Sequence, residues 1–163
     1  MPTPLLANQG NSGRWLPIPD QFDPSRPVVP CRPAHILLVE DHRQVRDVMA
    51  RALRTAGFVV SEAEGAETAR RIMGEERIDG AVLDISLGSD MNGLELGRWL
   101  RHCQPGIPII FVTGLSEWEL PEQAPQDGLT HMLRKPFGAR EIVSFVAAML
   151  APRRGLDGVV SGG

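Results

Sequence analysis

The chain has 163 residues, enough for one ordinary domain with tails. Its hydrophobic content of 42% and charged content of 23% are usual for a globular protein, and its net charge of −3 provides no general basic field for nucleic acid or an anionic membrane. Neither a membrane-spanning stretch nor a signal peptide is visible, and two cysteines are too few for a disulfide framework. We therefore expect a reduced, cytoplasmic protein that binds neither nucleic acid nor membrane.

Prolines dominate the N-terminal segment, because residues 1–33 hold 8 of the 14 prolines. Proline has no backbone N–H and blocks helices and central strands, so we expect a disordered or loosely docked arm over 1–33. The last residues, 151–163, have the composition of a flexible C-terminal tail. The globular domain is therefore expected to span residues 34–150.

Between the tails, apolar runs of strand length alternate with segments of helical periodicity. The apolar runs predict strands at His35–Glu40, Phe58–Val60, Gly80–Leu83, Ile107–Val112 and Leu129–Leu133. Apolar spacings of three and four residues predict helices through Val45–Leu53, Ala66–Met73, Leu96–Cys103 and Ile142–Leu150. Nearly all-apolar strands are buried on both faces, which indicates an α/β fold with a doubly wound parallel sheet of five strands and helices on both faces.

One further helix, the fourth in chain order, is expected between the last two strands. The segment there, SEWELPEQAPQDG over residues 116–128, carries Pro121 and Pro125 where the interior of a helix would lie. An interior proline costs about 3 kcal/mol. We therefore expect this fourth helix to be short or broken, or to be replaced by an ordered loop.

Polar residues follow the apolar runs at four strand ends. Glu40 and Asp41 follow the first strand, Asp84 the third, Thr113 the fourth and Lys135 the fifth. The carboxyl ends of parallel strands share one edge of the sheet, where ligands bind. Three carboxylates and one ammonium there suit a hard divalent cation such as Mg²⁺. A bound cation also explains the adjacent acids, since like charges held together raise each other's pKa.

These features resemble the receiver domain of bacterial two-component response regulators over roughly residues 34–150. The matching residues are Glu40–Asp41, Asp84, Thr113–Gly114 and Lys135–Pro136–Phe137. The resemblance implies a flavodoxin-like sheet with strand order 2-1-3-4-5 and a Lys135–Pro136 peptide that is often cis.

The same resemblance implies a role for each residue of the acidic edge. Asp84 would accept a phosphoryl group, Lys135 would pair with that group, and Thr113 would turn toward its oxygen. Mg²⁺ would be held by the side chains of Glu40, Asp41 and Asp84 and by the backbone carbonyl of Ser86. The physical chemistry fits these roles, because phosphoryl transfer between two anions needs neutralising positive charge.

Some residues depart from the usual family pattern. The loop ISLGSDMNG places Gly93 one residue further from Asp84 than usual and lacks the usual proline, and Met132 occupies the place of an aromatic switch residue. Together with the FVTG stretch ending at Gly114, in which Val112 replaces an alanine, this partly resembles the FAT-GUY subgroup. We expect the signal to pass through residues 114–130 instead of through a threonine–aromatic switch.

Two residues near these motifs receive simpler interpretations. His42, beside the acidic pair, is expected to begin the following helix rather than to bind metal. Cys103, at helical spacing, is expected to be buried and not redox-active.

The leading functional hypothesis is a stand-alone response regulator, a monomer or weak dimer. A histidine kinase or phosphotransfer protein would phosphorylate Asp84, and binding to an unidentified downstream protein would change. The chain would then be no enzyme, although it would assist its own phosphorylation and dephosphorylation. One alternative is a metal-dependent phosphatase or phosphotransferase, but Ser86 stands where many such enzymes carry a general acid. The other alternative is a phosphorylation-independent scaffold.

Overall fold

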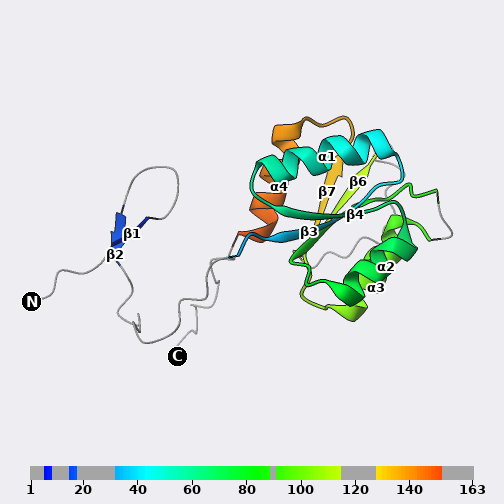
Figure 1. Cartoon of the computed structure of the whole chain (residues 1–163), viewed down its shortest axis with the longest axis horizontal. Helices are drawn as coiled ribbons and strands as arrows, with labels where there is room; N and C mark the ends of the chain where they lie inside the picture. Colours follow the sequence, from blue (N-terminus) through cyan, green and yellow to red (C-terminus); the bar gives the residue numbers. More distant parts are fainter. Residues whose placement is uncertain (1–5, 9–14, 18–31, 89–90, 115–127, 152–163) are drawn as a thin grey trace, which may run out of the picture. The chain divides into compact units, whose positions relative to one another are not determined.

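The computed structural model describes residues 6–8, 15–17, 32–88, 91–114 and 128–151. The chain divides into two units, Met1–Arg32 and Pro33–Gly163. In the first unit, strands β1 (Leu6–Asn8) and β2 (Trp15–Pro17) pair antiparallel (Figure 1), and the sequence did not predict them. The predicted C-terminal tail beyond residue 151 lies outside the described residues. So does nearly all of the segment predicted to hold a short or broken fourth helix.

The second unit is built on a parallel sheet. Its strands are β3 (His35–Val39), β4 (Val59–Ala63), β5 (Gly80–Asp84), β6 (Ile109–Thr113) and β7 (Thr130–Arg134). They lie in the order β4-β3-β5-β6-β7, and every neighbouring pair is parallel. Counted from β3, this is the order 2-1-3-4-5, so the predicted five-stranded, doubly wound fold is confirmed.

Four described helices cover the two faces of this sheet. They are α1 (Arg43–Thr55), α2 (Ala66–Glu75), α3 (Gly93–Cys103) and α4 (Ala139–Leu150). Figure 1 shows α1 and α4 on one face and α2 and α3 on the other. Among the described residues, no helix combines the length and the hydropathy of a membrane span.

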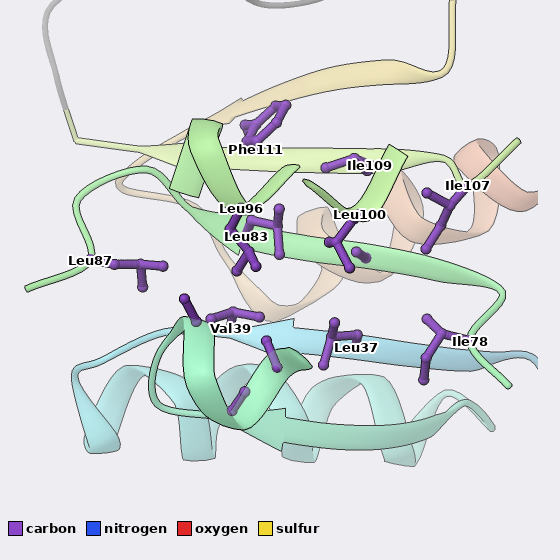
Figure 2. Packing of buried hydrophobic residues seen from close by; sticks show 14 of the residues in the cluster. Leu37, Val39, Ile78, Leu83, Leu87, Leu96, Leu100, Ile107, Ile109 and Phe111 are labelled. Carbon is purple, nitrogen blue, oxygen red and sulfur yellow. The ribbon is translucent and has the colours of Figure 1, made fainter. Parts of the chain in front are cut away.

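Strand β3 shows why the strand sequences are almost continuously apolar. Successive side chains of a strand point to opposite faces. Ile36 and Leu38 therefore pack with residues of α1 and α4, whereas Leu37 and Val39 pack with residues of α2 and α3. Figure 2 shows the cluster on the α2 and α3 side of the sheet, in which Leu37 and Val39 lie near the β5 residue Leu83. Because the sheet is covered on both sides, it is a rigid base for residues at its carboxyl edge.

The burial of two helices differs from the sequence-based expectation. The helical spacing predicts an apolar stripe on α1 made of Val45, Val48, Met49, Ala52 and Leu53. Met49 and Leu53 of this stripe are buried together with Ala50, whereas Val45 and Val48 are 38% and 64% exposed. Val48 lines a hollow between α1 and α4. The expectation that Cys103 is buried is wrong, since it is exposed at the last residue of α3.

Candidate functional site

The sheet register brings the predicted site residues to one edge. Strand β3 lies beside β5 with Val39 opposite Leu83. Glu40 directly follows β3 and Asp84 is the last residue of β5, so the two acids lie at the ends of neighbouring strands. On the other side of β5, Asp84 is paired with Val112 of β6. The carboxyl edge therefore gathers acidic residues from segments that are far apart in the sequence.

Lys135 joins the two buried acids. Its Nζ lies 2.9 Å from Glu40 Oε2 and 2.6 Å from Asp84 Oδ2. The side chains of Glu40 and Asp84 are 1% and 4% exposed, whereas that of Lys135 is 29% exposed. Burying carboxylates without a partner is costly, so the ammonium is what allows both acids at this position.

The backbone on either side of Lys135 fixes its approach to the acids. The Lys135 N–H donates to the carbonyl of Thr113 over 2.8 Å, which ties the residue after β7 to the end of β6. The peptide between Lys135 and Pro136 is cis, as the family resemblance implies.

Asp41 faces a different set of partners. Its Oδ2 accepts the N–H of Gly88 over 3.0 Å, and its Oδ1 lies 2.8 Å from His42 Nδ1. The same imidazole nitrogen lies 3.2 Å from Glu40 Oε1, which also accepts the His42 N–H over 3.1 Å. His42 therefore stands between the two adjacent carboxylates. Glu40, Asp41 and His42 each offer one ligand atom, and these atoms lie within 4.8 Å of one another.

The charges of the site influence one another strongly. Burial, together with the neighbouring Asp84, raises the pKa of Glu40 although the Lys135 hydrogen bond opposes this. Burial also acts to raise the pKa of Asp41, but the Gly88 N–H and the His42 imidazole outweigh it and lower the pKa. Burial acts to lower the pKa of Lys135, and Asp84 and Glu40 more than reverse this. The adjacent Asp41 raises the pKa of His42.

These directions indicate a site with more negative charge than one ammonium can balance. The raised pKa of Glu40 records an unfavourable buried charge. A divalent cation among the carboxylates would relieve that charge. The donor set consists of carboxylate oxygens, which Mg²⁺ prefers, so the residues fit the ion that the sequence predicted.

The remaining predicted site residues lie close to Asp84. The N–H of Ser86 donates to Asp84 Oδ1 over 2.9 Å, and this hydrogen bond fixes the orientation of the carboxylate. Thr113, the last residue of β6, is 2% exposed. Direct contacts thus join Glu40, Asp84 and Lys135, while Asp41 is linked to them through His42. The roles predicted for the Ser86 carbonyl and the Thr113 hydroxyl stay predictions.

Two supporting residues were not predicted from the sequence. Arg46, on the first turns of α1, donates to the backbone carbonyl of Glu40 over 2.7 Å and holds the end of β3 in place. Gly93 packs so closely that a Cβ there would lie 2.0 Å from the carbonyl oxygen of Asp84. The sequence singled out Gly93 only for its spacing, and no sequence signal marked Arg46.

Comparison with curated proteins gives relatives of the whole domain. The chain is 37% identical over 119 residues to the sensor kinase CckA of Brucella abortus, a match that covers 72% of this chain and 12% of that protein. It is 33% identical over 120 residues to the probable transcriptional regulatory protein SilR of Salmonella typhimurium, covering 74% of this chain and 51% of that protein. The chain thus spans about half of the length of SilR and 12% of that of CckA. The similarity therefore concerns one domain of these relatives and not their complete activities.

The solved structures that resemble this chain are receiver domains as well. A response regulator receiver domain protein from Methanospirillum hungatei is 27% identical with a TM-score of 0.66, over 72% of this chain and 94% of that one. A receiver protein from Sinorhizobium medicae is 26% identical with the same TM-score of 0.66. The family model of the response regulator receiver domain matches residues 36–147, which include the acids, the lysine and all of the parallel sheet except His35. With its fold, its acidic edge and these matches, the chain belongs to the response regulator receiver domain family.

Proposed function

We propose that the chain is a signalling phosphoacceptor. Asp84 receives a phosphoryl group from a partner histidine kinase or phosphotransfer protein, and the modified domain changes its binding to a downstream protein. The observation that carries this proposal is the contact of 2.6 Å between the buried Asp84 carboxylate and the Lys135 ammonium at the carboxyl edge of the sheet. Membership of the receiver family supports it.

The chemistry is a transfer between two anions. An oxygen of Asp84 attacks the phosphorus atom, an O–P bond forms, and the bond from phosphorus to the donor group breaks, with its electron pair leaving on the donor. The Ser86 N–H holds Oδ1, so Oδ2 beside Lys135 is the oxygen that we assign to the attack. The Lys135 ammonium then lies next to the incoming oxygens and reduces their repulsion from the carboxylate.

The metal site of the proposal uses the acids around Asp84. Glu40, Asp41 and Asp84, together with the backbone carbonyl of Ser86, would hold Mg²⁺. When bound, this ion supplies positive charge for the oxygens of the transferred group. The raised pKa of the buried Glu40 supports the assignment, because the free site carries an unfavourable negative charge.

Phosphorylation would then change the partners of Lys135 and Thr113. In the structure the Lys135 ammonium donates hydrogen bonds to both Glu40 and Asp84. A phosphoryl group adds negative charge and acceptor oxygens, so Lys135 and the Thr113 hydroxyl gain a new partner and can bias a two-state element. We propose residues 114–130 as that element, which an amide-exchange comparison with and without a phosphoryl mimic tests.

The decisive experiment detects the modified residue directly. The purified chain is incubated with acetyl phosphate and Mg²⁺, and its intact mass is measured. The wild type should gain one phosphoryl group, and Asp84→Asn should gain none. Asp47→Asn is the matched control, because Asp47 is an exposed aspartate on α1 that pairs with Arg43, and it should behave as the wild type does. A mass gain in Asp84→Asn equal to that of the wild type would refute the assignment.

The same preparation separates signalling from enzymatic turnover. Ser86 offers no carboxylic acid, and its N–H is engaged with Asp84, so no general acid is placed two residues after the nucleophile. We therefore expect at most one phosphoryl group per chain and no turnover of phosphate esters.

The proposal keeps the organisation expected from the sequence. It comprises an arm over 1–33, a receiver domain over 34–150 and a tail over 151–163, in a stand-alone cytoplasmic protein that is a monomer or weak dimer. Limited proteolysis followed by mass measurement tests the boundaries. Sedimentation tests the oligomeric state, and the size of the native polypeptide in cell extracts tests whether the chain acts alone.

A further inference from the structure

The His42 imidazole lies beside the two adjacent carboxylates of the acidic site. Its Nδ1 is 2.8 Å from Asp41 Oδ1 and 3.2 Å from Glu40 Oε1. We propose that His42 is a side-chain ligand of the acidic site, and that with Glu40 and Asp41 it allows the site to take a divalent transition ion such as Co²⁺, Ni²⁺ or Zn²⁺ as well as Mg²⁺. This inference rests on the proposed function, because it shares Glu40 and Asp41 with the magnesium site.

The distances are those expected between ligands of one ion. Nitrogen and oxygen ligands lie at about 2.0–2.2 Å from a zinc-sized ion, which separates neighbouring ligands by about 3 Å when the ion is octahedral. The two measured separations, 2.8 Å and 3.2 Å, fall on either side of that value. The three ligand atoms already share a space 4.8 Å across, so binding would require only small movements of the side chains.

The backbone turn after β3 produces this arrangement. Glu40 directly follows the strand, and His42 is the residue before the first turn of α1, with an extended backbone at φ −77° and ψ 105°. The His42 N–H donates to Glu40 Oε1, which holds the turn closed. Three consecutive side chains therefore converge although they belong to a strand end and a helix start.

Helix capping does not explain the orientation of the imidazole. Within the described part of the chain, the His42 side chain makes no capping hydrogen bond to α1. The side chain is 74% exposed, and exposed ion pairs contribute little stability because water screens them. The imidazole is nevertheless directed at two carboxylates, one of which is buried.

The chemistry of imidazole sets the selectivity. Mg²⁺ prefers oxygen ligands and keeps several waters, so it gains little from a nitrogen ligand. Imidazole suits zinc, copper, iron and nickel, and divalent cobalt is a related ion that also absorbs visible light. Removal of His42 should therefore weaken binding of a transition ion and leave binding of Mg²⁺ nearly unchanged.

The test compares two ions on the full-length chain and its variants. Calorimetric titrations with Co²⁺ and, separately, with Mg²⁺ give the affinities of the wild type and of His42→Ala. We expect the Co²⁺ affinity of His42→Ala to fall by about 10-fold or more, and its Mg²⁺ affinity to change by less than about 2-fold. The visible absorption of bound Co²⁺ should also shift, because a nitrogen ligand is lost.

Matched variants separate the possible outcomes. His102→Ala removes another exposed histidine, at the end of α3, and should bind both ions as the wild type does. Asp41→Asn should weaken the binding of both Co²⁺ and Mg²⁺, since Asp41 is a proposed ligand of either ion. Circular dichroism and the midpoint of urea unfolding verify that His42→Ala is folded.

Two results would overturn the inference and leave the proposed function intact. One is Mg²⁺ binding by the wild type without Co²⁺ binding, and the other is equal Co²⁺ affinity and an identical Co²⁺ spectrum in the wild type and His42→Ala. Failure of the wild type to bind either ion or to gain a phosphoryl group would instead contradict the proposed function itself.

Discussion

Lys135 and Asp84 are 51 residues apart in the sequence, yet the Lys135 ammonium donates to Asp84 Oδ2 over 2.6 Å. The same ammonium donates to Glu40 Oε2 over 2.9 Å, across 95 residues. One cation from the end of β7 therefore pairs with two buried acids at the ends of β3 and β5. The charge balance of the site exists only when all of these strands are assembled in one sheet.

Lys135→Met tests this charge balance. The variant keeps an unbranched side chain but leaves Glu40 and Asp84 with like charges and no ammonium. We expect the free energy of unfolding without metal to fall by about 1–3 kcal/mol, the cost of leaving a buried polar group unsatisfied. Urea unfolding in EDTA and in saturating Mg²⁺ measures the loss, which should be smaller with Mg²⁺ because a bound cation replaces part of the lost positive charge.

The double variant Lys135→Met with Asp84→Asn is the control for this prediction. Removing the Asp84 charge as well relieves the repulsion with Glu40, so the double variant should lose less stability than the sum of the two single losses. Strictly additive losses would show that the ammonium and the carboxylate do not interact in solution.

Magnesium itself should stabilise the folded chain. A ligand that binds only the folded state adds about 2.7 kcal/mol at a free concentration one hundred times its Kd. Thermal unfolding at increasing Mg²⁺ should therefore show a rising Tm, a smaller rise in Asp41→Asn, and an unchanged rise in the control Asp47→Asn. A Tm that is independent of Mg²⁺ in the wild type would contradict the metal site.

The stabilisation by Mg²⁺ should also depend on pH. The pKa of Glu40 is raised by burial, so this ligand takes up a proton at a higher pH than an ordinary glutamate does. A protonated carboxyl is a poor metal ligand, and the increase in Tm caused by Mg²⁺ should therefore shrink as the pH falls toward and through the pKa of Glu40. An increase that grows on acidification would contradict the assignment of Glu40 as a ligand.

Gly93 packs closely against the backbone of Asp84 and Ile85. A Cβ at residue 93 would lie 2.0 Å from the Asp84 carbonyl oxygen and 2.9 Å from Ile85 Cα, so the backbone must shift to admit it. We expect Gly93→Ala to cost about 1–3 kcal/mol of stability, as overpacking does. Displacement of the Asp84 carboxylate should also lower the rate of phosphorylation by acetyl phosphate about 10-fold or more.

Gly74→Ala is the matched control for Gly93→Ala. Gly74 lies within α2, and a Cβ there meets nothing within 4 Å. The alanine should raise stability by about 0.5–1 kcal/mol, because it restricts the unfolded chain and favours helix. Similar effects of both substitutions on the phosphorylation rate would show that the close approach at Gly93 does not position Asp84.

The sequence predicted most of the fold because the central strands of the parallel sheet are buried on both faces. Only apolar residues fit such strands, so β3 and β5 were visible as uninterrupted apolar runs, and the acids that end those runs marked the carboxyl edge. The order of the strands came from the family resemblance. The support of Glu40 by Arg46 has no sequence pattern, since it depends on how α1 leaves the strand.

The position of His42 between two carboxylates was also not predicted. A histidine at the start of a helix has several common roles, and only the backbone turn at residues 40–42 determines where its ring points. The apolar stripe of α1 was overestimated for a related reason. Helical spacing shows which residues share a face, but not how much of that face the neighbouring helix covers.

Helix α1 allows a direct test of how much of a predicted apolar face is buried. Val48 is 64% exposed beside the hollow between α1 and α4, whereas Leu53 on the same helix is fully buried at 0% exposure. Val48→Glu should change the free energy of unfolding by no more than about 0.5 kcal/mol, as surface substitutions usually do. Leu53→Ala should cost about 2–5 kcal/mol, because it removes buried methyl groups and leaves a cavity.

Urea unfolding of the two α1 variants shows whether the whole apolar stripe of α1 is buried, as the sequence pattern predicts, or only part of it, as in the structure. If the apolar stripe were fully buried, a glutamate at residue 48 would lie in the core and would destabilise the domain as strongly as Leu53→Ala does. A small effect at residue 48 and a large one at residue 53 would place the boundary of the core along α1 between these two side chains. The sheet would then be covered by the Met49, Ala50 and Leu53 side of the helix, with the valines left at its surface.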